Sequence, residues 1–137
     1  MSEENVEVVR QLYDATARHD TDRVYALYDP EIEWDVSQDP TMLPMFGSAV
    51  YRGHDGLRHF FREWFETWEE IRNEPDELID LGDSIVVVVT DRARGRTSGV
   101  PVVREHAAIW TVRDGRVLRV VWFPTRAAAL EAAGLSE

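Results

Sequence analysis

Cysteine is absent from the 137-residue sequence, so the chain has no disulfide and no thiolate chemistry. Its longest apolar run, IVVVV at 85–89, is far shorter than the roughly 20 residues that a membrane-spanning helix needs. The N-terminal sequence MSEENVEVVRQ lacks the basic region and the apolar core of a secretory signal peptide. From these absences we expect a cytoplasmic protein that does not enter a membrane.

Positive charge is also scarce. The sequence has 15 basic residues against 26 acidic ones, and its formal net charge is -11. A surface of this charge repels phosphate backbones and anionic lipid head groups. We therefore expect neither nucleic acid nor a membrane surface among the partners.

The motifs of the common metal and nucleotide sites are missing as well. His19, His54 and His59 do not form pairs with the spacing of metal ligands, which predicts no metal. There is no glycine-rich phosphate loop, no G-x-S-x-G elbow and no Ser/His/Asp arrangement. Any chemistry is therefore expected to proceed without a cofactor.

The hydrophobic content of 44% and the length predict one globular domain over residues 1–137. Apolar residues recur at helical spacing in 2–20 and again in a short helix through Tyr28, which Pro30 ends. The segment EIEWDV at 31–36 then alternates like a strand, with Ile32, Trp34 and Val36 on one face and three acids, including Asp35, on the other. The first half is thus mostly helical.

The stretch YRGHDGLRHFFREWFETW at 51–68 is rich in aromatic residues. Its large apolar residues lie on one face of a helix and predict core packing more than a binding motif. They are Leu57, Phe60, Phe61, Trp64, Phe65 and Trp68.

The second half consists of four apolar runs separated by turns, and it predicts four antiparallel strands. Asp114-Gly115 is a strong hairpin signal between the last two runs. Thr125 and Gly134 bracket a short C-terminal helix. Because helices and strands are segregated along the chain, the fold class is predicted to be α+β.

Residues 37–53 form a long aperiodic connection that nevertheless carries Met42, Leu43, Met45 and Phe46. Long connections in compact domains are commonly lids or binding loops. Two interpretations stay open: a lid over a pocket and a contact with a second subunit.

The order of elements resembles the SnoaL-like family of the nuclear-transport-factor-two-like superfamily. The segments VRQLYDATARHDTDRVYALYDPEIEW, YRGHDGLRHFFREW and SGVPVVREHAAIWTVRDGRVLRVVWF carry the resemblance, together with the tail TRAAALEAAGL. It implies three N-terminal helices packed on a strongly curved, mostly antiparallel sheet, which forms a cone with an apolar pocket, and a short C-terminal helix. It also implies a small hydrophobic ligand and a homodimer through the outer sheet face.

Alternation in 104–112 places His106 and Trp110 on one sheet face, and by the resemblance this face looks into the cone, as does that of Trp122. An aromatic cone suits a flat apolar ligand. The ligand-binding candidates are Tyr13, Trp34, Tyr51, Phe61, Trp64, Trp110 and Trp122.

Three residues are catalytic candidates. His106 lies mid-strand among apolar residues, where an imidazole can act as acid or base, and Asp91 is its possible partner. Asp35 resembles the proton-shuttling Asp of the steroid isomerases of this fold, but the second acid of those enzymes falls on Ala108 here, and the alternation groups Asp35 with solvent-facing acids. Asp35 and Asp91 therefore remain alternatives.

Two functions stay open from the sequence. One is a cofactor-free acid–base enzyme of the isomerase, cyclase or hydrolase type, acting on a carbonyl-bearing or polyketide-like substrate. The other is a non-catalytic ligand-binding or dimeric scaffold protein of the same fold. An aromatic cone with a polar minority is compatible with both.

Overall fold

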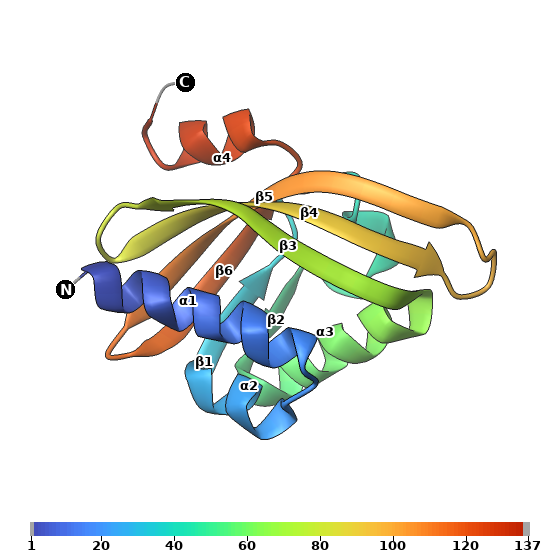
Figure 1. Cartoon of the computed structure of the whole chain (residues 1–137), viewed down its shortest axis with the longest axis horizontal. Helices are drawn as coiled ribbons and strands as arrows, with labels where there is room; N and C mark the ends of the chain where they lie inside the picture. Colours follow the sequence, from blue (N-terminus) through green and yellow to red (C-terminus); the bar gives the residue numbers. More distant parts are fainter. Residues whose placement is uncertain (1, 136–137) are drawn as a thin grey trace.

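The structure is a computed structural model that describes residues 2–135 (Figure 1). Helices precede and interrupt the first two strands, and a run of four long strands follows. In chain order the elements are α1 (Ser2–Ala17), α2 (Thr21–Leu27), β1 (Tyr28–Asp35), the 3-10 helix η1 (Leu43–Met45), β2 (Val50–Arg52), α3 (Gly53–Thr67), β3 (Trp68–Asp80), β4 (Ser84–Gly95), β5 (Pro101–Arg113), β6 (Arg116–Phe123) and α4 (Arg126–Ala132).

The six strands form one curved sheet in the order β2-β1-β6-β5-β4-β3. Only the β1–β6 pair is parallel within the described residues. Figure 1 shows α1, α2 and α3 on one side of this sheet and α4 on the other. The α+β fold with a curved, mostly antiparallel sheet is therefore confirmed. No helix within residues 2–135 has the length and apolar character needed to cross a membrane.

The main core lies between the three N-terminal helices and the concave face of the sheet. Phe60 of α3 is 1% exposed and lies at its centre, with ring centroids 4.9 Å from both Trp34 and Phe46 and 5.5 Å from Trp122. Tilted and edge-on contacts of this kind add to the energy of burying the rings. The aromatic face predicted for 51–68 is thus mainly core.

A smaller apolar cluster lies on the convex face, where Ala129 and Leu130 of α4 cover part of the sheet. Thr125 caps α4 by accepting the Ala128 N–H at 3.0 Å, and Gly134 follows with a φ of 80°. Both observations confirm the predicted short helix and its ends. The Asp114-Gly115 hairpin is confirmed too, because both residues have the positive φ that such a tight turn requires.

Two element boundaries differ from the sequence-based prediction. Tyr28 opens β1 instead of ending α2, and the β1–β6 register shifts between Tyr28 and Glu33, so the strand accommodates Pro30 at this irregularity. Trp68 opens β3 instead of ending α3, although its ring centroid still lies 6.3 Å from that of Trp64. Trp68 would lie beside Trp64 either as the last residue of a helix or as the first residue of a strand. The sequence spacing alone therefore does not tell a helix end from a strand start at this position.

The connection between β1 and β2 packs onto the chain's own core. Met42 is buried, and the Phe46 ring stacks on Trp64 with centroids 6.2 Å apart. The Glu63 carboxylate accepts the Gly47 N–H at 2.7 Å and the Tyr51 hydroxyl at 2.6 Å. The apolar residues of this connection therefore cover one end of the cone.

The packing predicts that replacing two different phenylalanines of α3 changes the free energy of unfolding by very different amounts. Replacing the buried Phe60 by Ala should lower the free energy of unfolding by about 3–5 kcal/mol, because it leaves a cavity in the core. Replacing Phe65, which is 39% exposed, should cost less than about 1 kcal/mol. Urea unfolding of both variants measures the difference, and equal losses would contradict this description of the core.

Candidate functional site

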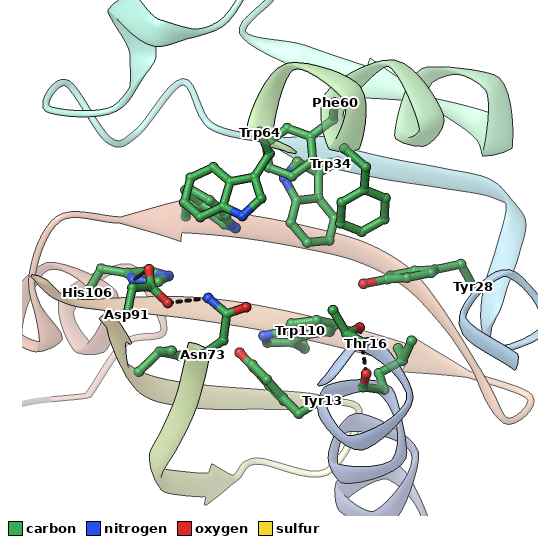
Figure 2. A pocket seen from close by; sticks show the side chains of 14 residues that line it. Tyr13, Thr16, Tyr28, Trp34, Phe60, Trp64, Asn73, Asp91, His106 and Trp110 are labelled. Carbon is green, nitrogen blue, oxygen red and sulfur yellow. Dashed lines mark hydrogen bonds and ion pairs between the residues drawn. The ribbon is translucent and has the colours of Figure 1, made fainter. Parts of the chain in front are cut away.

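A cavity of about 60 Å³ lies inside the cone, between the helices and the concave face of the sheet (Figure 2). Its walls are mainly aromatic, and its polar side chains come from α1 and from three neighbouring strands. The lining residues are Leu12, Tyr13, Thr16, Tyr28, Trp34, Phe60, Phe61, Trp64, Asn73, Val89, Asp91, His106, Trp110 and Trp122.

A buried acid–base pair forms one end of this cavity. His106 Nδ1 on β5 lies 2.9 Å from Asp91 Oδ2 on β4, and the two residues are 4% and 6% exposed. The Asn73 side-chain amide on β3 donates a hydrogen bond of 2.5 Å to the other Asp91 oxygen. Figure 2 shows the three side chains gathered on one side of the cavity.

The strand register creates this arrangement. Asn73 and Asp91 are direct partners across β3 and β4, while His106 pairs with Val89, two residues before Asp91. Side chains two residues apart on a strand share a face, so His106 and Asp91 are diagonal neighbours on the concave side. The predicted pairing of His106 with Asp91 is therefore present in the structure.

The two ring nitrogens of His106 differ in their surroundings. Nδ1 approaches Asp91 at ion-pair distance, but the angle is too bent for a well-aligned hydrogen bond. Nε2 has no hydrogen-bonding partner among residues 2–135. The ring also packs against Trp122, with centroids 5.1 Å apart. Nε2 is consequently the nitrogen available to a molecule in the cavity.

Two tyrosine hydroxyls lie in the same cavity (Figure 2). Burial raises the pKa of Tyr13 far above its ordinary value, and the negative charge of Asp91 raises it further, while the nearby Trp110 indole offsets part of the effect. Burial likewise raises the pKa of Tyr28, with smaller contributions from Tyr13 and Tyr25. Both phenols therefore stay neutral at physiological pH and keep a proton to donate.

Two indole N–H groups are further donors. Trp34 Nε1 and Trp110 Nε1 are buried and make no hydrogen bond of good geometry, although Trp110 lies close enough to Tyr13 to affect its pKa. Buried polar groups in proteins are usually satisfied. A ligand oxygen in the cavity would supply the missing acceptor.

Most of the predicted ligand-binding residues line the cavity, but Tyr51 does not. Its ring packs on Phe60, and its hydroxyl donates to Glu63. Burial and this hydrogen bond raise the pKa of Tyr51 to about 12. The residues that do line the cavity are Tyr13, Trp34, Phe61, Trp64, Trp110 and Trp122.

Asp35 is not part of this cavity, which corrects its place among the catalytic candidates. Its carboxylate accepts hydrogen bonds from the Ser37 N–H and hydroxyl at 2.8 and 2.6 Å and lies 3.7 Å from Arg119 Nη2. It lines a separate hollow with Ile109 and Val121, on the convex face. The physical reason is the alternation along β1, which sends Trp34 into the cone and Asp35 to the opposite side.

Asn73 and Tyr28 are site residues that the sequence analysis missed. Asn73 lies just before EPDELID, which is the first of the four runs that predict strands in the second half, whereas β3 already begins at Trp68. Tyr28 was assigned to a helix but belongs to β1. A predicted strand that began closer to Trp68 would have included Asn73 and placed it beside Asp91.

The cavity continues toward the surface between α1, α3 and β3. A groove of about 420 Å³ shares several residues with the cavity, among them Tyr13, Phe61, Trp64 and Asn73. Phe65 and Trp68 extend its apolar wall, and Glu70 and Arg72 lie among its polar residues. A molecule larger than the cavity would therefore extend into this groove.

No group of three or more His, Asp or Glu residues in the part of the chain that the structure describes is arranged to hold a metal ion. The site contains one imidazole, one carboxylate, an amide and several neutral donors. This set is suited to proton transfer and to hydrogen bonding of an oxygen atom.

Comparison with known proteins agrees with the fold. The sequence profile of the SnoaL-like domain matches residues 9–120. An NTF2-like protein of unknown function from Burkholderia pseudomallei is 27% identical, with a TM-score of 0.79 over 93% of this chain and 95% of that chain. No curated protein matches the chain.

Two further solved structures share the fold at lower identity. TerC, co-crystallised with polyporic acid, is 23% identical with a TM-score of 0.78, and covers 93% of this chain and 96% of its own. A protein described as a putative polyketide cyclase from Sinorhizobium meliloti is 21% identical with a TM-score of 0.64, over 89% of this chain and 98% of its own. At these identities the likeness concerns the fold alone.

The tyrosine environments predict an unusual alkaline titration. The pKa of each of the four tyrosines is raised, so the phenolate absorbance of the folded protein should rise at a higher pH than the ordinary value of about 10. The unfolded chain binds fewer protons than the folded one above this pH, so the free energy of unfolding should fall as the pH rises further. Tyr13→Phe should flatten this fall.

Ultraviolet titration of the folded protein and of the same protein in urea measures the two states. In urea all four phenols should titrate near ~10. A folded protein in which Tyr13 ionises at its ordinary pH would contradict the buried, neutral phenol.

Proposed function

Because the chain belongs to the SnoaL-like domain family, we propose that it is a cofactor-free enzyme that moves a proton at a carbon beside a carbonyl group. The proposed substrate is a small, mostly apolar molecule of aromatic or polyketide-like character. One observation carries the proposal: the buried His106–Asp91 pair at the end of an apolar cavity, with His106 Nε2 unpartnered among the described residues.

His106 would act as the base. A neutral imidazole accepts the substrate proton at Nε2 and becomes an imidazolium, which the Asp91 carboxylate beside Nδ1 stabilises. Asn73 holds Asp91 by its amide and so limits the rotation of the carboxylate. Returning the proton to another carbon of the substrate completes an isomerisation. In a cyclisation, the enolate carbon would attack a second carbonyl of the same molecule, and the His106 imidazolium would return the proton to the alkoxide oxygen that this attack forms.

The donors in the same cavity would stabilise the enolate oxygen. The Tyr13 phenol stays protonated, so it donates a hydrogen bond instead of repelling the developing negative charge. The Trp34 indole N–H has no hydrogen-bonding partner among the described residues and adds a further fixed donor, while the Trp110 N–H lies beside the Tyr13 hydroxyl. Preorganised donors in a site with little water are the largest single contribution in many enzymes of this kind.

The volumes of the cavity and of the adjoining groove support a substrate that occupies both spaces at once. The cavity of about 60 Å³ has room for the reacting end only, and the adjoining groove of about 420 Å³ would hold the remainder. Phe61, Trp64 and Phe65 give this groove an aromatic wall. A flat ring system that carries a ketone at one end fits both spaces.

The alternative is a binding protein without turnover. The observation that favours it is the bent approach of His106 Nδ1 to Asp91, because a histidine base works best when its second nitrogen is firmly hydrogen-bonded. A ligand bound to the same donors would then be held without proton transfer.

The proposal is tested by the exchange of ketone protons for deuterium. In D₂O, indanone or tetralone should exchange its α-protons faster with the protein than without it, as followed by NMR. His106→Gln should lower this rate by about 10²–10⁴-fold, because the general base is removed. Asn73→Ala should lower it less, since Asn73 acts through Asp91.

Asp35→Asn is the matched control, because Asp35 lies on the other face of the sheet. It should leave the exchange rate unchanged. An unchanged rate in His106→Gln would reject the assigned base. Binding of these ketones without any exchange would favour the non-catalytic alternative.

We further propose that the protein forms a homodimer through the convex face of the sheet. On this face Ile109 lines a hollow with Val121 and Phe123, next to α4. Sedimentation velocity at micromolar concentration should give twice the chain mass, and Ile109→Arg should give a monomer. Val100→Arg, an exposed turn position, is the control and should stay dimeric. A monomeric wild-type protein would refute this arrangement.

A further inference from the structure

A second pocket lies outside the proposed active cavity, under the connection between β1 and β2. Its volume is about 230 Å³, and we call it the methionine pocket. The residues that define it are Met42, Met45, Trp68, Ala93, Val102 and Arg104.

The methionine pocket adjoins the cone cavity without being part of it. Of the residues that the structure describes, Trp64 and Asp91 alone line both spaces, so these two side chains form the partition between them. The pocket is also the larger of the two. An apolar cavity of roughly 150 Å³ is enough to bind benzene, so a substituted aromatic ring fits here.

Arg104 is a polar residue in the lining of this mostly apolar pocket. One guanidinium nitrogen, Nη2, pairs with the fully buried Asp39 of the β1–β2 connection. The other, Nη1, is buried and makes no hydrogen bond. Because a buried donor without an acceptor is destabilising, an oxygen atom of a ligand would find a prepared partner here.

The charges around the pocket select against an anion. Asp39 already neutralises Arg104, and Asp91 adds a second carboxylate at the partition. A carboxylate ligand would face this negative charge in a poorly hydrated space. A neutral oxygen of the carbonyl type would accept from Arg104 without that repulsion.

We propose that the methionine pocket is a second small-molecule site, which binds a neutral aromatic molecule with one carbonyl oxygen directed at Arg104. The flexible thioether side chains of Met42 and Met45 adapt to ligands of differing shape. Binding at this site does not require turnover at His106, and the site meets the proposed active site at the shared partition.

Methionine methyl groups provide a direct test, because both internal methionines line the pocket. In protein labelled with ¹³C at the methionine methyls, titration with acetophenone should shift the Met42 and Met45 resonances and reach saturation. Ethylbenzene, which has the ring but no oxygen, should bind about tenfold more weakly. Benzoate should also bind more weakly than acetophenone.

Variants locate the bound molecule. Ala93→Leu fills the methionine pocket and should abolish the methyl shifts, while Val89→Ile, on the same strand but facing the cone cavity, should preserve them. Replacing both charges together, Arg104→Met with Asp39→Leu, avoids leaving one buried charge unpaired. This double variant should bind acetophenone and ethylbenzene equally.

Several results would overturn the proposal. One is that the methionine methyl shifts persist in Ala93→Leu. Another is that benzoate binds more tightly than acetophenone. A third is that the methyl resonances do not shift up to the solubility limit of acetophenone, including the case in which the proton spectrum shows shifts only at the indole N–H groups of Trp34 and Trp110. His106→Gln distinguishes this site from the proposed function. It should remove deuterium exchange and leave the methyl shifts intact.

Discussion

The register of β3, β4 and β5 is the constraint on which the site depends. Asn73 opposes Asp91, and His106 lies diagonally across the next strand pair. A slip of one residue in either pairing would turn a member of this group to the convex face. Such a slip in β5 would bring the exposed Glu105 or the small Ala107 into the cone in place of His106, and burying an unpaired carboxylate is costly. Burial thus fixes the position of the polar group.

The apolar lining of the cone strengthens the electrostatic interactions of the few polar groups inside it. In a space lined by indole and phenyl rings, the interaction between Asp91 and an imidazolium at His106 is screened less than it would be in water. The same surroundings keep Tyr13 protonated. The weak screening in the cone therefore strengthens a charge interaction at one group and keeps a neutral donor at another, and this combination suits the proposed formation of an enolate.

Alternation along the strands made much of the site predictable. It grouped His106 with Trp110 and grouped Asp35 with the acids of the other face, while the family resemblance directed the faces of Trp110 and Trp122 into the cone. Asp91 was only a possible partner of His106, and the structure brings the two together. Asn73 escaped prediction because its strand begins in a sequence of mixed charges, where no apolar alternation marks the start. The cavity volumes were beyond prediction, since they depend on how side chains from distant elements interlock.

The partition between the two cavities ties their occupancy to one carboxylate. One oxygen of Asp91 accepts from Asn73 and the other faces His106, while the side chain also lines the methionine pocket. A neutral ligand in that pocket would exclude water from Asp91 without supplying a competing charge. Exclusion of water strengthens the attraction between Asp91 and an imidazolium at His106. Because the ligand proposed for the methionine pocket is neutral, it could be bound there while a substrate occupies the cone cavity.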